Sequence, residues 1–167
     1  SKNKNGILDI YLMNADGTEP RRLALGGWPS WSRDSTHVYY HSRLDNALCL
    51  TSIKGQDAEP KRIMACSNWF PSVSADNQRV AYLEGSLLKV KDLASQSLVA
   101  EWPAPLDLWR GTTWSPTGRE ICLGGSTTTE ERTGLWFYGF DRTQPAAVLD
   151  GPIVSASWSP AGTELTF

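Results

Sequence analysis

The chain has 167 residues, enough for one ordinary domain, and carries a formal net charge of −2 at pH 7. Acidic and basic residues are scattered, and no run of Lys or Arg forms a basic face, so the composition excludes the usual nucleic-acid footprint. No apolar stretch approaches the length of a membrane span, and the opening SKNKNGILDI lacks the apolar core of a secretory signal.

The first predicted element is a pair of strands within residues 9–25, DIYLMNADGTEPRRLAL, with a turn at Asp16-Gly17. The same pattern, two apolar stretches around a polar turn, recurs over residues 47–64, 86–102 and 135–150. Each of these segments is therefore predicted to form two neighbouring strands.

A twelve-residue phrase follows each crossing between these strand pairs. It reads PSWSRDSTHVYY from residue 29, PSVSADNQRVAY from 71, TTWSPTGREICL from 112 and ASWSPAGTELTF from 156, at spacings of 42, 41 and 44 residues. Within it, Ser115-Pro116-Thr117-Gly118 has the chemistry of a tight turn, because proline pre-sets φ at the second position and glycine suits the fourth. Each phrase is predicted to be a β-hairpin.

The apolar positions of the four hairpins fall into matching columns. The column before the turn holds Trp31, Val73, Trp114 and Trp158, the next holds Val38, Val80, Ile121 and Leu165, and the last holds Tyr40, Tyr82, Leu123 and Phe167. The opposite face is also largely apolar, which is typical of a sheet packed between two others. Four short strands for every repeat of this length predict the blade of a β-propeller, with aromatic rings at the seams between blades.

With both halves of the repeat in view, the chain resembles the TolB-like propellers, a branch of the WD-type repeat family. Their repeat places a proline before a Trp-Ser-Pro-Asp-Gly turn and an Ile-Tyr strand; the matching segments here are 29–32, 114–118, 158–162 and 9–13. The second copy departs from the pattern with Val73, and no copy keeps the whole Ser-Pro-Asp-Gly turn. The resemblance implies an all-β propeller of four-stranded antiparallel blades, and it implies little about function, because propellers serve many.

Residues 1–167 are predicted to contain about four blade equivalents, as three whole blades and two terminal half-blades. Three arrangements stay open: a piece of a longer propeller, a four-bladed ring closed by the two half-blades, and two chains that share their junction blades. Open strand edges are prone to pairing, so we expect further blades or a second copy of the chain to cover them.

The sequence contains no recognisable catalytic or metal-binding pattern. His37 and His41 share a strand face about 13 Å apart, too far for one metal ion, and are predicted to be partly exposed strand residues. No nucleophile elbow, phosphate loop or dinucleotide fingerprint occurs, so neither cofactor nor metal is expected. Asp34 and Asp76 are interpreted as turn residues rather than a paired-carboxylate site, and Cys49, Cys66 and Cys122 as buried free thiols.

The candidate binding residues are Trp28, Trp69, Trp109, Arg110 and Arg43. The first four precede the first strand of a blade, where the chain crosses from one blade to the next, and Arg43 lies in a connection between second and third strands. In a propeller these segments gather on one face, where exposed Trp and Arg are typical of binding hot spots. The alternative is that these tryptophans pack between blades.

The predicted function is a non-enzymatic scaffold that binds a protein or peptide. Two alternatives remain: the non-catalytic propeller portion of a larger hydrolase similar to prolyl peptidases, and a propeller-based lyase. The polar segment 126–134 is predicted to be a solvated loop.

Overall fold

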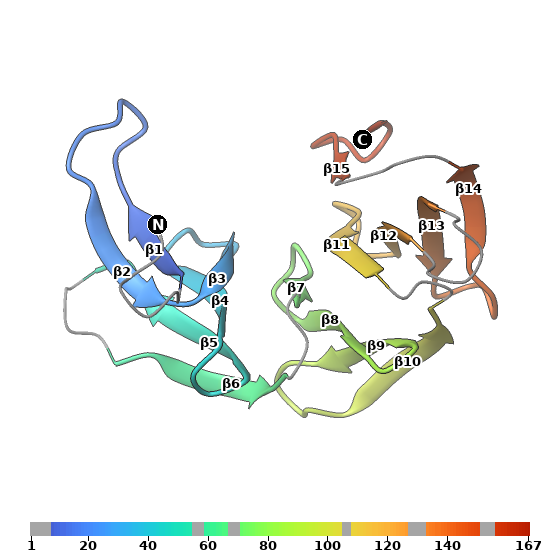
Figure 1. The fold of residues 1–167 in the computed structure, drawn as a ribbon, viewed down its shortest axis with the longest axis horizontal. Helices are drawn as coiled ribbons and strands as arrows, with labels where there is room; N and C mark the ends of the chain where they lie inside the picture. The colour runs from blue at the N-terminus through green and yellow to red at the C-terminus, as the bar shows by residue number, and fades with distance from the viewer. Residues whose placement is uncertain (1–7, 55–58, 67–70, 105–107, 127–132, 151–155) are drawn as a thin grey trace. The chain divides into compact units, whose positions relative to one another are not determined.

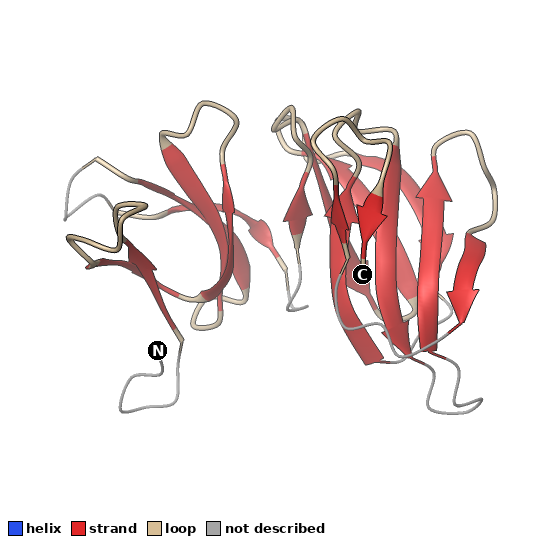
Figure 2. Cartoon of the chain, turned by 90° about the horizontal axis from the view of Figure 1, so that it is seen from above, coloured by secondary structure: helices blue, strands red, loops and turns tan. Residues whose placement is uncertain are grey.

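The computed structural model describes residues 8–54, 59–66, 71–104, 108–126, 133–150 and 156–167. Over these ranges the chain is built from strands and turns (Figure 2), and it contains no helix long and apolar enough to cross a membrane. The contacts group into two compact units, Ser1–Pro71 and Ser72–Phe167, which we describe one after the other.

Unit 1 contains one four-stranded antiparallel sheet, blade 1, and one two-stranded sheet, the N-terminal half-blade (Figure 1). The strands of blade 1 lie side by side in chain order, as four-stranded blades were predicted to do. The half-blade consists of β1 (Asp9–Leu12) and β2 (Arg21–Leu25), and blade 1 of β3 (Gly27–Trp31), β4 (His37–Ser42), β5 (Ala47–Ser52) and β6 (Lys61–Ala65).

Unit 2 contains two further four-stranded antiparallel sheets and a C-terminal half-blade. Blade 2 is formed by β7 (Ser72–Val73), β8 (Arg79–Glu84), β9 (Leu87–Asp92) and β10 (Leu98–Pro103). Blade 3 is formed by β11 (Leu108–Trp114), β12 (Glu120–Ser126), β13 (Thr133–Gly139) and β14 (Ala146–Asp150), and the half-blade by β15 (Ser157–Trp158) and β16 (Leu165–Thr166). Residues 127–132 of the predicted polar loop lie outside the described residues.

The strand registers confirm the predicted columns. In every hairpin the residue before the turn faces the residue of the second column, in the pairs Trp31↔Val38, Val73↔Val80, Trp114↔Ile121 and Trp158↔Leu165. The four copies of the phrase therefore fold into the same hairpin in the same register.

Blade 2 shows how a turn without proline closes its hairpin. The Ser74 hydroxyl donates to Asp76 Oδ1 at 2.6 Å, while Ser74 Oγ accepts the backbone N–H of Arg79 at 2.9 Å. Asn77 N donates to Ser74 O at 2.9 Å, and Asn77 has a φ of 59°, close to the 67° of Gly118 in the proline-containing copy. The equivalent Asp34 accepts from the Ser32 hydroxyl at 2.6 Å. The predicted turn role of both aspartates is thus confirmed.

The core of unit 2 fills the seam between blades 2 and 3. Val90, Leu123 and Tyr138 are fully buried in it together with Trp114, which is 7% exposed. Trp114 Nε1 donates to Ser72 O at 2.9 Å, so the indole of blade 3 is hydrogen-bonded to the first strand of blade 2. All three cysteines are free and buried, as predicted.

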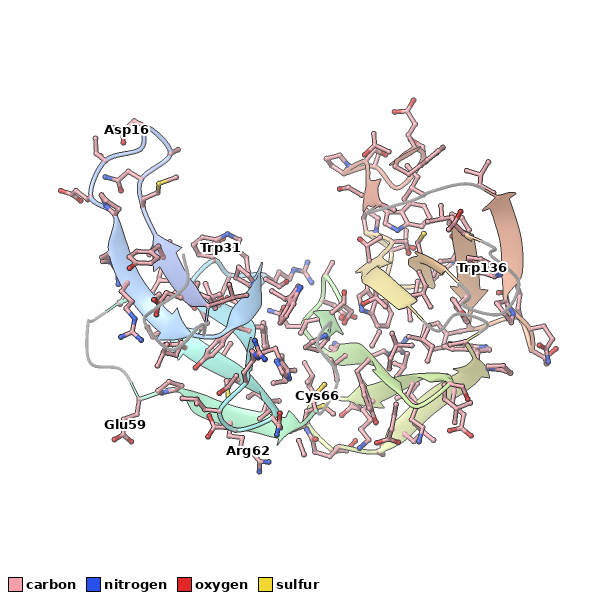
Figure 3. All side chains as sticks on the ribbon, viewed as in Figure 1. Asp16, Trp31, Glu59, Arg62, Cys66 and Trp136 are labelled. Atoms are coloured by element: carbon pink, nitrogen blue, oxygen red, sulfur yellow. The ribbon has the colours of Figure 1, made fainter. Side chains whose placement is uncertain are left out.

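Trp31 departs from the expected seam position. Trp31, labelled in Figure 3, is 53% exposed. Its counterpart Trp114 is 7% exposed. Trp114 contacts a first strand in the preceding blade, whereas the described part of the N-terminal half-blade holds only β1 and β2. Trp31 has the predicted register but lacks the surface that would bury it.

Candidate functional site

The candidate site in unit 1 lies at the end of blade 1 where β3 begins, β4 ends and β6 leads out of the sheet. Gly26 brings the chain into this end across β4. A Cβ at residue 26 would lie 2.4 Å from His41 O and 2.5 Å from Tyr40 Cδ2, so only glycine allows this close approach. The segment that carries Trp28 is thereby pressed against the end of β4.

A β-bulge then places Trp28. Gly27 pairs with His41 and Ser30 with Tyr39, so Trp28 and Pro29 together face a single residue of β4. Trp28 has a φ of 54°, in the left-handed region that costs a non-glycine residue about 1–2 kcal/mol. Blade 3 has its bulge one pair further along, between Trp109 and Gly111, and the residue that precedes its repeat phrase, as Trp28 precedes the first, is Gly111, with a φ of 132°.

His41 lies beneath Trp28 and is 1% exposed. Its ring meets the indole edge-on, with centroids 6.0 Å apart and an interplanar angle of 67°. His41 Nε2 lies 2.9 Å from Cys66 O; since a carbonyl only accepts, Nε2 carries a hydrogen and donates it, and the other ring nitrogen is Nδ1. That Nδ1 is buried and has no hydrogen-bond partner among the described residues.

The connection between β4 and β5 forms the rim of the site. The Ser42 hydroxyl donates to Asp45 Oδ2 at 2.6 Å, and Asn46, with a φ of 43°, completes the turn. Asn46 O accepts the backbone N–H of Cys66 at 2.8 Å, which ties the turn to the segment that leaves β6. This geometry leaves Arg43 exposed and Leu44 63% exposed beside the site.

The histidine prediction was wrong for His41. Both histidines were expected to be partly exposed; His37 is half-buried, but His41 is enclosed because Gly26 and Trp28 cross over it. His37 Nδ1 lies 2.7 Å from the hydroxyl of its neighbour Thr36. The sequence carried one signal for the burial of His41, namely its place in the otherwise apolar run VYYH.

The structure places the predicted site residues only in part. Trp28 and Arg43 lie at the same end of blade 1. Trp109 and Arg110 lie on β11 of unit 2, where Trp109 pairs with Gly125, and Trp69 lies outside the described residues. The gathering of all five on one face stays a prediction.

His41 as the ring partner of Trp28, and Cys66 as the hydrogen-bond partner of His41, were not predicted from the sequence. The described residues include no group of three His, Cys, Asp or Glu side chains placed to hold a metal ion. The end of blade 1 brings together a half-buried tryptophan, an exposed arginine and an exposed leucine.

Comparison of the fold with solved structures gives clear similarity at low sequence identity. The crystal structure of TolB from Acinetobacter baumannii matches with a TM-score of 0.72 and 15% identity over 94% of this chain and 42% of that one. The chain has a TolB-like β-propeller fold. The Kuenenia stuttgartiensis hydrazine synthase matches with a TM-score of 0.67 and 14% identity over 94% of this chain and 48% of that one.

The TolB-like chain therefore spans less than half the length of either protein it matches. At these identities the similarity concerns the fold alone. No protein-family model matches the sequence, and no curated protein matches it.

Proposed function

We propose that this chain is a non-enzymatic propeller scaffold that binds an extended peptide segment at the end of blade 1. The observation that carries the proposal is Trp28, a half-buried tryptophan held at a φ of 54°, in a place before the repeat phrase where blade 3 has a glycine. Backbone strain of this kind is found preferentially at ligand-binding positions, where the surrounding structure maintains it. Here Gly26 and His41 provide that surrounding structure.

The neighbours of Trp28 suggest the chemistry of the segment. Leu44 and the indole give an apolar surface, and Arg43 gives a planar donor suited to a carboxylate. The favoured ligand is a peptide with an apolar or aromatic side chain and an acidic residue near it. The absence of a nucleophile elbow, phosphate loop or dinucleotide fingerprint from the sequence supports binding without catalysis.

The test is selection of ligands from a library of random displayed peptides on the immobilised full chain. Selected peptides are then measured by fluorescence anisotropy against the chain and its Trp28→Ala and Arg43→Ala variants. We expect each change to weaken binding at least tenfold, which corresponds to about 1.4 kcal/mol. Leu98→Ala, which removes an apolar side chain 49% exposed on β10, serves as the matched control and should leave affinity unchanged.

Thermal unfolding of the same variants separates binding from folding. Trp28→Ala should lower stability by no more than about 1 kcal/mol, because the lost edge-on ring contact is of that size. Selected peptides that bind all three variants equally would overturn the site. A Trp28→Ala chain that unfolds would show that the residue serves the core instead.

A further inference from the structure

The seam between blades 2 and 3 carries a group of aromatic side chains that lies apart from the peptide site. Phe140 begins the turn between β13 and β14 and is 36% exposed. Its ring stacks on Trp114 with centroids 6.2 Å apart and an interplanar angle of 21°, and it meets Trp102 edge-on at 5.5 Å. Both blades have all four strands within the described residues, so the seam is formed inside unit 2.

The backbone around Phe140 is tied to blade 2. Arg142 N donates to Gly139 O at 3.1 Å, which closes the turn that carries Phe140. Trp102 Nε1 donates to Arg142 O at 3.0 Å, which joins this turn to the last strand of blade 2. Because its turn is hydrogen-bonded to β10 and its ring contacts two indoles, Phe140 offers a fixed aromatic surface at the seam.

Arg79, the first residue of β8, lies against this ring. Its Cζ is 4.9 Å from the centroid of Phe140, within the range of a cation–π interaction. In the part of the chain that the structure describes, the guanidinium makes no hydrogen bond and no ion pair; only the backbone of Arg79 is bonded, to Ser74. Arg79 is half-buried, so the aromatic ring positions its N–H donors while no side chain uses them.

Two carboxylates neighbour Arg79 in the sheet and the turn, and both accept hydrogen bonds from other donors. Asp92 pairs with Arg79 across β8 and β9, but its Oδ1 accepts the backbone N–H of Ser95 at 2.8 Å. Asp76 Oδ1 accepts from the Ser74 hydroxyl at 2.6 Å. Each turn engages its own carboxylate, and neither carboxylate forms an ion pair with Arg79 in the described structure.

The hairpin does not require an arginine at this position. The residue whose carbonyl accepts the backbone N–H of the turn serine is Arg79 in blade 2, and it is His37, Glu120 or Glu164 in the other three hairpins. The role of the carbonyl is thus independent of the side chain. An arginine that is held by a ring and has unused donors loses little conformational freedom when it binds a ligand.

We propose that Arg79 and Phe140 form a binding site for a carboxylate carried on an apolar group. The planar guanidinium donates two parallel N–H bonds to the carboxylate, and the exposed part of the Phe140 ring contacts the apolar group. Asp76 and Asp92 set the specificity, because their negative charges repel a dianion such as phosphate more strongly than a monoanion.

The site uses none of the residues of the peptide site in unit 1, so either site can fail without the other. The carboxylate belongs to a free acid or to a residue of a peptide, and the choice of probes distinguishes these two sources. They are phenylacetate, acetate, inorganic phosphate, and a Phe-Glu dipeptide with blocked ends beside its Phe-Gln counterpart.

The test is a titration of the isotope-labelled full chain with each probe. It follows the Arg79 Nε–Hε resonance by nuclear magnetic resonance, assigned by its loss in Arg79→Lys. We expect phenylacetate or the Phe-Glu dipeptide to bind at least tenfold more tightly than acetate and phosphate, and the Phe-Gln dipeptide to bind at least fivefold more weakly than Phe-Glu. Tighter binding of phenylacetate assigns the site to a free acid, and tighter binding of Phe-Glu assigns it to a peptide.

Variants then test the two side chains. Arg79→Lys keeps the charge but loses the planar donor pair, and should weaken the tighter probe at least tenfold. Phe140→Leu keeps an apolar side chain without the ring, and should weaken it at least threefold. Arg33→Lys is the matched control: Arg33 is exposed in the corresponding turn of blade 1, and its side chain has no hydrogen bond, ion pair or ring contact in the described structure, so affinity should not change.

Thermal unfolding and circular dichroism establish that each variant is folded before affinities are compared. If Phe140→Leu unfolds, Arg79→Lys alone decides the outcome. Equal affinity of the unmodified chain and Arg79→Lys overturns the proposal, as does an equal loss in Arg33→Lys. The absence of a saturable shift with every carboxylate also overturns it, and so does phosphate that binds more tightly than both phenylacetate and Phe-Glu.

Discussion

Removal of the Ser74 hydroxyl tests the physical account of the repeat phrase. Ser74 is 2% exposed, and its Oγ accepts the Arg79 N–H at 2.9 Å. Its hydroxyl hydrogen is donated to Asp76 Oδ1 at 2.6 Å, and Arg79 O is a second, more distant acceptor at 3.1 Å. In Ser74→Ala the Arg79 N–H loses this acceptor, at a cost of about 1 kcal/mol. The bond to the carboxylate is charge-assisted and contributes about 1.5–3 kcal/mol, but Asp76 is exposed and regains water, so the lower end applies.

The expected loss for Ser74→Ala is therefore about 2–3 kcal/mol, measured as the shift in free energy of unfolding by urea titration. Ser159→Ala is the matched control in the C-terminal half-blade. Ser159 Oγ accepts one exposed hydrogen bond, from Glu164 N at 3.1 Å, so its loss should be under about 1 kcal/mol. Equal losses in the two variants would refute the view that the Ser74 hydroxyl, through its partly buried hydrogen bonds, closes the hairpin.

Three further predictions concern single groups. Gly26→Ala should destabilise unit 1 by about 1–3 kcal/mol in urea titration, because the new Cβ would overlap His41 O; an unchanged midpoint would contradict the close approach. Hydrogen bonds from Ser32 and Thr36 lower the pKa of Asp34 from 3.8 to about 2. The contribution of Asp34 to stability is therefore complete above pH 4 and is lost as the pH falls toward 2. Asp34→Asn should flatten the pH dependence of the thermal midpoint in that window, and a profile identical to that of the unmodified chain would contradict this role of Asp34. Burial raises the pKa of the Cys122 thiol to about 12, so a thiol reagent at pH 8 should modify it only after unfolding, and rapid labelling of the native chain would show that it is accessible.

Local chemistry made the hairpins predictable from the sequence. Proline and glycine around Trp114 specify the turn through residues that are neighbours in the chain, and alternation then assigns Ile121 to the buried column. The four-strand repeat was predictable for the same reason, since each blade repeats a local pattern. The spacing of the repeat phrase is enough to predict the four-stranded blade, because it requires no information about long-range contacts.

The environment of individual residues depended on contacts that the sequence does not display. His41 is buried because Gly26 lets a distant segment cross over it, and Trp28 has a positive φ because a bulge holds it there. Trp31 has the same place in the repeat phrase as Trp114, yet it is exposed because the neighbouring sheet is a half-blade. The sequence pattern predicts which position of the hairpin a residue occupies. Whether that residue is buried depends on the sheet that packs against it.

The hydrogen bond from Trp114 to Ser72 makes a later blade depend on an earlier one. The indole of blade 3 uses a carbonyl of the sheet that precedes it in the chain, so an earlier sheet satisfies a donor of a later one. Ser72 precedes Trp114 in the chain, so the acceptor is synthesised before its donor. Deletion of the C-terminal half-blade should consequently leave this bond intact, whereas deletion of β7 leaves the Trp114 indole without its acceptor.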